Sequence, residues 1–133
     1  MSPEEKQARI NALVEHYRPY LGLQDWTIKV EFFPNRKAMG EEEDQCAAGC
    51  VANPEYESAE LAFAVDEMQP GGMDMDVLHE MCHTLNWRLF YLAEWMVEQH
   101  DPENAALRKW LQLELESCTT RMERILARLI PRL

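Results

Sequence analysis

The sequence predicts one α+β domain over residues 1–133, with an N-terminal helix, a short and mostly antiparallel sheet, and two long helices. Three observations support this prediction. A length of 133 residues suits a single domain, and an apolar content of 47% is enough to form a core. The apolar periodicity is helical at the start, alternating in the middle, and helical again after residue 73.

The first helix is expected to begin at Ser2. The serine can cap the helix, Pro3 fills its first position, and Glu5 follows three residues after the cap, as in a capping box. Apolar residues then recur at helical spacing, at Ile10, Leu13, Val14 and Tyr17. Pro19 indicates that the helix ends just before it.

The middle of the chain contains the predicted strands. Apolar side chains alternate with polar ones over residues 26–32, and with small ones over residues 58–66, so both segments read as strands. Residues 35–50 are expected to form a loop whose acidic run, 41–44, is solvated. A further short strand is expected at 47–52, before the Asn53-Pro54 turn.

Two long helices are expected to complete the domain. The first can be capped by Asp74 or Asp76 and should run to about residue 99. Asp101-Pro102 interrupts the pattern, and the last helix should run from about residue 103 to Pro131, which stops it.

Composition excludes several classes of function. The net charge of -11 would repel a nucleic-acid backbone, and the arginines of the last helix are expected to complement its dipole. The chain has no apolar run near the roughly 18 residues of a membrane span, and its acidic start does not resemble a signal peptide. A cytoplasmic protein with reduced cysteines is therefore expected. Cys46 and Cys50 form only a weak metal-binding signal, because no second close pair accompanies them.

The stretch MDMDVLHEMCHTLNW, residues 73–87, contains the most specific motif. His79 and His83 lie four residues apart, so a helix places both on one face, where they can bind one metal ion. Glu80 lies about 100° around the helix from His79, at the edge of such a site. A carboxylate there can deprotonate a metal-activated water without being a ligand, which is the arrangement that zinc hydrolases use.

The alternative interpretation is an amphipathic helix whose two histidines are satisfied in the core without metal. The residues around them are apolar, and buried imidazoles without metal would then need other hydrogen-bond partners. Cys82 faces away from the metal-binding face and is expected to lie in the core.

A catalytic zinc ion needs a third protein ligand. Leu89 occupies the position where the metzincin pattern has a histidine, and Glu94 is about 16 Å along the helix axis from His83. The ligand should therefore come from the last helix. If that helix folds back antiparallel, residues 118–122 lie opposite the histidines, and the choice stays open among Glu114, Glu116 and Glu123.

The chain resembles the small phage-encoded zincin-like metallopeptidases, a gluzincin-type group of phage and prophage genomes. The resemblance covers most of the chain, and four segments carry it: 21–30, 56–61, 77–83 and 115–122. It implies a single Zn²⁺ held by His79, His83 and Glu116, with Glu80 as general base, in a bacterial or phage-infected cell. Met81-Cys82 and Thr84 depart from the family, which often has leucines in and after the motif.

Three functions are compatible with these features. The first is a zinc-dependent metallopeptidase that hydrolyses peptide bonds of a peptide or protein substrate, with the substrate paired to an exposed strand, plausibly 58–66. Its oxyanion would be stabilised by Tyr56, Tyr91 or His100. The second is a weakly active or inactive zincin-like binding or regulatory module of phage or prophage origin. The third is a helical protein without metal. Nucleic-acid and membrane partners are not expected, and oligomeric state is not predicted.

Overall fold

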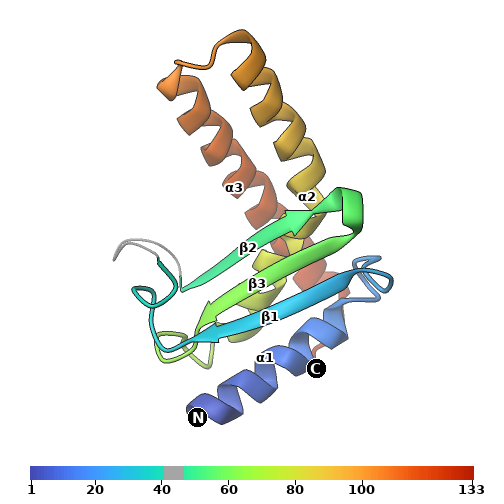
Figure 1. Ribbon diagram of the computed structural model, residues 1–133. Helices are drawn as coiled ribbons and strands as arrows, with labels where there is room; N and C mark the ends of the chain where they lie inside the picture. The colour runs from blue at the N-terminus through green and yellow to red at the C-terminus, as the bar shows by residue number, and fades with distance from the viewer. Residues whose placement is uncertain (41–46) are drawn as a thin grey trace.

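The computed structural model describes residues 1–40 and 47–133, and these form an α+β domain with helices at both ends of the chain (Figure 1). The acidic run 41–44 and Cys46 lie outside the described residues. The elements follow in the order α1 (Pro3–Tyr17), β1 (Thr27–Phe33), β2 (Ala48–Asn53), η1 (Pro54–Tyr56), β3 (Ser58–Ala64), α2 (Met73–His100) and α3 (Ala105–Leu129). These bounds confirm the predicted helices and strands to within a few residues.

The three strands form one mixed sheet in the order β1-β3-β2. β1 pairs with β3 in parallel over seven residues, and β2 pairs with β3 antiparallel over six. The sheet is therefore mixed, whereas the sequence predicted a mostly antiparallel one. The short η1 turn reverses the chain between β2 and β3, while a longer connection leads from β1 to β2 and leaves room for β3 between them. β3 is thus the central strand, and the prediction that it offers an exposed edge is wrong.

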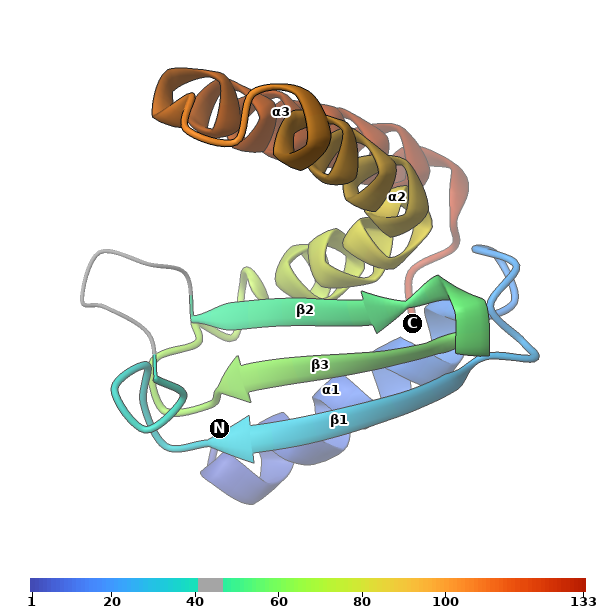
Figure 2. The same cartoon turned by 45° about the horizontal axis from the view of Figure 1, so that its top comes forward.

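Helix α1 and the first half of α2 cover one face of the sheet (Figure 2). Leu61 and Phe63 of β3 are almost completely buried against them, and the partly buried apolar side chains of β1 pack against the same core. The helices contribute Ile10, Leu13, Val14, Tyr17, Met73, Val77, Leu78, Met81 and Cys82 to this core, and the segments outside the helices and strands add Leu21, Leu23, Val65, Met68 and Ile130. The first half of α2 is therefore fixed on two sides, by α1 and by the sheet. The burial of Cys82 confirms its expected place in the core.

The ends of the helices are set by specific polar contacts. At α1 the predicted capping box is present, with the Ser2 side chain accepting from the Glu5 backbone and the Glu5 side chain accepting from the Ser2 backbone. At α2 the prediction is wrong: Gly72 is the N-cap, and no side chain caps it. Asp74 instead pairs with Arg9 of α1 at 3.0 Å, a contact between distant parts of the chain.

The second half of α2 and the first half of α3 form a helical hairpin that projects from the domain (Figure 1). Among the α2 residues after Thr84 only Phe90 is buried, and Thr119 is the only buried residue of α3. Large apolar side chains therefore remain exposed on this hairpin, among them Leu89, Tyr91, Leu92, Trp95, Trp110 and Leu113. In the described part of the chain, no helix is apolar enough over a sufficient length to cross a membrane.

Candidate metal centre

Helix α2 presents the three residues of the His-Glu-x-x-His motif where it leaves the core. The imidazole rings of His79 and His83 lie one turn apart, with their centroids separated by 4.7 Å. One possible ligand atom from each of His79, Glu80 and His83 lies within 4.8 Å of the other two. His83 and Glu80 are almost buried, at 7% and 5% exposed. The motif thus forms a compact group at the edge of the core rather than a surface feature.

Helix α3 returns antiparallel and brings the carboxylate of Glu116 to both histidines. One Glu116 oxygen lies 3.2 Å from Nε2 of His79, and the other lies 3.2 Å from Nε2 of His83. Both imidazoles therefore direct the same ring nitrogen toward one carboxylate. This register agrees with the one expected for a helix that folds back after residue 102.

The other ring nitrogen of each histidine is held by a different side chain of α3. Nδ1 of His79 lies 2.6 Å from a carboxylate oxygen of Glu123. Nδ1 of His83 makes a long contact of 3.5 Å with the hydroxyl oxygen of Thr119. Metal-binding histidines are generally oriented in this way, with one ring nitrogen held by an oxygen and the other left for the metal.

The hydrogen bonds of Thr119 assign the tautomer of His83. Its hydroxyl donates its only proton to the carbonyl oxygen of Leu115 at 2.8 Å and accepts from the side chain of Asn86 at 3.2 Å. It can therefore only accept from Nδ1–H of His83, so neutral His83 carries its lone pair on Nε2. That lone pair faces a carboxylate oxygen of Glu116 at 3.2 Å, an arrangement that a metal ion between the two atoms would stabilise.

The two distances between Glu116 and the imidazoles are close to the separation of neighbouring ligands in a tetrahedral zinc site. Zinc binds histidine nitrogen and carboxylate oxygen at about 2.0–2.2 Å, which separates two ligands of a tetrahedron by about 3.3 Å. The two contacts between Glu116 and the imidazoles are both 3.2 Å. His79, His83 and Glu116 could thus hold an ion between them with little rearrangement, and two imidazoles with one carboxylate are a donor set that suits Zn²⁺.

Glu80 lies beside this group, on the side facing the sheet. Its negative charge helps to raise the pKa of the Cys50 thiol on β2. Burial in turn raises the pKa of Glu80 itself to about 7. Its carboxylate makes no side-chain hydrogen bond with the described residues. Carboxyl groups whose pKa is raised in this way by burial are found at functional sites.

The structure distinguishes the three glutamates that the sequence left open. Glu116 contacts Nε2 of both histidines, whereas Glu123 contacts only Nδ1 of His79. Glu114 points elsewhere and accepts a hydrogen bond from the Trp110 indole at 3.3 Å. The geometry therefore favours Glu116 as a ligand and Glu123 as the residue that orients His79.

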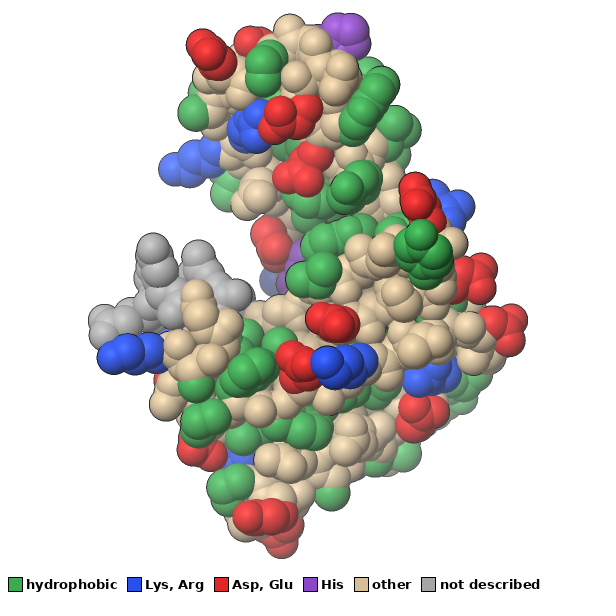
Figure 3. Space-filling model, in the orientation of Figure 1, with side chains coloured by type: hydrophobic (Ala, Val, Ile, Leu, Met, Phe, Trp, Pro, Cys, Tyr) green, Lys and Arg blue, Asp and Glu red, His purple; other side chains and the backbone are tan. Residues whose placement is uncertain are grey.

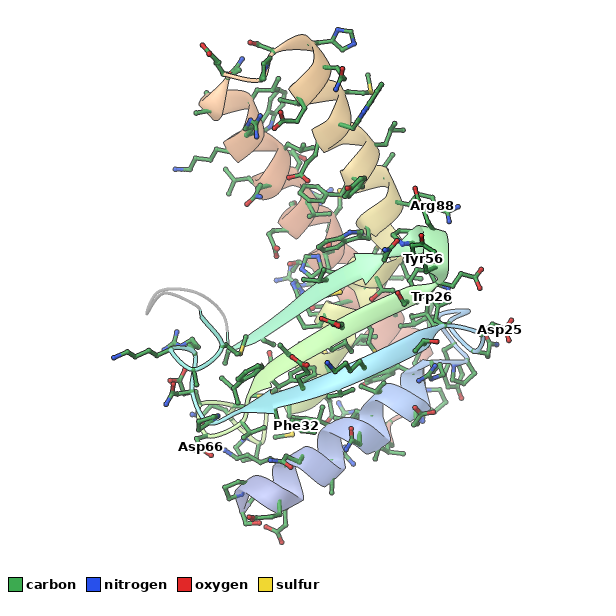
Figure 4. All side chains as sticks on the ribbon, in the orientation of Figure 1. Asp25, Trp26, Phe32, Tyr56, Asp66 and Arg88 are labelled. Atoms are coloured by element: carbon green, nitrogen blue, oxygen red, sulfur yellow. The ribbon has the colours of Figure 1, made fainter. Side chains whose placement is uncertain are left out.

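Other residues considered from the sequence lie away from this group. Tyr56 is exposed at the η1 turn, close to Arg88 in Figure 4, and Tyr91 is exposed on the projecting hairpin. His100 is the last residue of α2, far along the helix from His83. Among the described residues, none of these three hydrogen-bonds to the motif.

The cysteines give no support for a second metal site. Cys50 lies 3.4 Å from the hydroxyl of Thr84, and burial raises the pKa of its thiol to about 12. Its candidate partner, Cys46, is outside the described residues.

Sequence reasoning assigned no role to Thr119 or Asn86, which together orient His83. A signal for both was present, because Asn86 lies three residues after His83 and Thr119 lies three residues after Glu116. That spacing places each on the face of its own helix that carries the candidate ligand.

Substitution of Glu123 by glutamine is expected to weaken zinc binding by roughly 10- to 100-fold, the range seen when a partner of a metal-bound histidine is replaced. Glutamine keeps the shape of the side chain but lowers the basicity that the carboxylate confers on His79. Titration with zinc in a competing chelator measures the change. Arg124→Gln, at the next position of α3, serves as control, and equal affinities for both variants would contradict the assigned role.

The metal-free protein is expected to lose stability as the pH rises from 6.5 to about 9. The hydrogen bond with Glu116, opposed by partial burial, raises the pKa of His79 from 6.5 to about 9. Because the folded protein binds this proton more tightly than the unfolded chain does, the stabilisation is complete below pH 6.5 and disappears as the pH passes 9. Urea unfolding of the chelator-treated protein across this range measures it. Glu116→Gln should flatten the dependence, and rising stability would contradict the explanation.

No protein-family model, curated protein or solved structure matches this chain. The interpretation of the site therefore rests on the side chains that α2 and α3 bring together.

Proposed function

We propose that this protein is a zinc-dependent metallopeptidase of the gluzincin-like type, with one Zn²⁺ held by His79, His83 and Glu116. One observation carries the proposal: Nε2 of each histidine lies 3.2 Å from an oxygen of the Glu116 carboxylate, while each Nδ1 contacts another side chain of α3. The resemblance of the sequence to small phage-type zincin-like metallopeptidases supports this proposal.

Glu80 is the proposed general base. A bound zinc ion would polarise the scissile carbonyl and lower the pKa of the attacking water. Glu80 accepts the proton of that water and passes it to the leaving amine. Its raised pKa, about 7 in the metal-free protein, suits a group that both takes up and releases a proton near neutral pH.

Glu80 is preferred as base rather than as ligand for a geometric reason. Glu116 already supplies a carboxylate that contacts both imidazoles. Glu80, one residue after His79, lies on the side of α2 that faces β2. Glu80 would therefore be free to act on a water rather than serve as a ligand.

The proposed substrate is a peptide bound in extended form along β2. Strand β2 is an edge of the sheet and packs directly on α2, where Cys50 contacts Thr84. Its outward backbone N–H and C=O groups have no partner strand among the described residues, so an extended peptide can pair with them. Figure 3 shows the surface hollowed between this edge and the projecting hairpin, with a histidine at the inner end of the hollow.

The test of this proposal begins with metal content. Protein purified without chelator is expected to contain one zinc ion per chain and to hydrolyse an unfolded protein such as casein. Treatment with a chelator should abolish hydrolysis, and added Zn²⁺ should restore it. Ala substitution of His79 or His83 should remove the zinc. Retention of zinc in both variants, or hydrolysis that survives its removal, would refute the proposal.

A further inference from the structure

A second hollow adjoins β2 beyond the metal centre. The last residues of β2 and the η1 turn form one side of this groove, and the projecting part of α2 forms the other. Its volume is about 810 Å³. The groove is lined by Val51, Ala52, Asn53, Pro54 and Glu55 on one side and by Arg88, Tyr91, Leu92 and Trp95 on the other.

The groove offers apolar surface without an occupant among the described residues. Val51, Tyr91, Leu92 and Trp95 are each more than half exposed. Several such side chains around one concavity, with polar residues at its rim, are typical of a binding site. Arg88 fixes one rim of the groove, because its guanidinium donates to the carbonyl oxygen of Pro54 at 3.1 Å, and Figure 4 shows it beside the η1 turn.

The groove and the metal centre are connected by the edge of β2. Cys50 is the β2 residue beside the metal centre, since it contacts Thr84 and the charge of Glu80 acts on its thiol. Asn53, three residues further, lines the groove. At about 3.3 Å per residue this separation is about 10 Å, which an extended peptide covers with three residues.

We propose that this groove binds a bulky aliphatic or aromatic side chain of the substrate peptide, about three residues from the cleaved bond. The inference rests on the proposed function, because the peptide must lie along β2 with its scissile bond at the metal centre. The occupant is apolar, since the exposed side chains that line the groove are mainly Val, Leu, Tyr and Trp. A chain with a net charge of -11 also disfavours acidic peptides, so the substrates are neutral or basic segments with one such apolar side chain.

The experiment compares cleavage profiles of the zinc-loaded protein on peptides from a digested bacterial proteome, with cut sites read by mass spectrometry. Large apolar residues are expected to be enriched roughly tenfold over alanine at the third position on one side of the cut. Trp95→Ser should remove this enrichment. Trp110→Ser is the matched control, because Trp95 and Trp110 are 55% and 61% exposed but only Trp95 lines the groove.

Two results would overturn the inference while the proposed function stands. They are Glu80-dependent cleavage with no apolar preference at that position, and a preference that Trp95→Ser leaves unchanged. A wild-type dimer that Trp95→Ser converts to monomer in sedimentation would also overturn it, because a second copy would then occupy the groove.

A binding measurement separates the inference from catalysis. Zinc-loaded Glu80→Gln protein is incubated with the same peptides, and the retained peptides are sequenced. Enrichment of large apolar residues that Trp95→Ser abolishes and Trp110→Ser preserves would support the groove even if no peptide is hydrolysed, a result that would count against the peptidase alone. Equal retention of apolar and polar peptides would refute the groove.

Discussion

Replacement of Glu80 by glutamine is expected to lower the rate of peptide hydrolysis on the order of 10³-fold, because general-base catalysis contributes roughly 10²- to 10⁴-fold. Glutamine fills the same nearly buried position but cannot take a proton from the attacking water. Zinc content should stay at the wild-type value, since the proposed ligands are unchanged. The measurements are the initial rate of casein hydrolysis and the zinc stoichiometry on the same preparation.

The control for this variant is Glu114→Gln, which changes a carboxylate of α3 that bonds to Trp110 and not to the histidines. It should hydrolyse casein at the wild-type rate. Unchanged hydrolysis in Glu80→Gln would exclude Glu80 as the base. Stoichiometric zinc without hydrolysis in the wild type would instead favour a zincin-like binding module.

Substitution of Glu116 by alanine is expected to weaken zinc binding by more than 100-fold, beyond the roughly 10- to 100-fold cost of losing a residue that only orients a ligand. The substitution removes the one carboxylate that contacts both imidazoles. The Glu116 side chain is 57% exposed, so its loss should leave the core and the fold intact. Competition with a chromophoric chelator gives the affinity, and circular dichroism gives the helix content.

Glu114→Ala again provides the comparison, two residues away on the same helix, and should bind zinc as the wild type does. The informative contrary result is a Glu116→Ala protein with wild-type affinity alongside a Glu123→Ala protein that binds no zinc. That pair of results would move the ion to Nδ1 of His79 and make Glu123 the ligand.

The sequence predicted the central part of the site because local geometry determines it. Four-residue spacing on a helix puts His79 and His83 on one face whatever surrounds them. The antiparallel return of α3 followed from the break near Asp101-Pro102 and placed residues 118–122 opposite the histidines. The structure agrees, with Thr119 in contact with His83.

The choice among the glutamates could not be predicted from periodicity. Glu116 and Glu123 are seven residues apart and share a face of α3, so both reach His79. Which ring nitrogen each one meets depends on how α3 is rotated and packed. Thr119, completely buried between them, is part of that packing, and its hydrogen bonds connect α3 to both His83 and Asn86.

The order of the strands in the sheet also could not be predicted from the sequence. Alternation identifies which face of a strand is buried, but it does not identify the neighbouring strands. The antiparallel expectation was therefore wrong for β1 and β3, and the strand expected to offer an exposed edge is the central one. The predicted cap of α2 was also wrong, because the helix begins at Met73 and both Asp74 and Asp76 lie inside its first turn.

The scarcity of buried residues in α3 has a consequence for the mechanics of the domain. Apart from Thr119, this helix is held by partly buried side chains such as Met122 and Leu126. An ion shared by Glu116 and the two histidines would act as a clasp between α2 and α3, coupling the outer helix to the rigid core. Metal binding would then determine how firmly α3 is attached to α2, in addition to supplying the chemistry of the site.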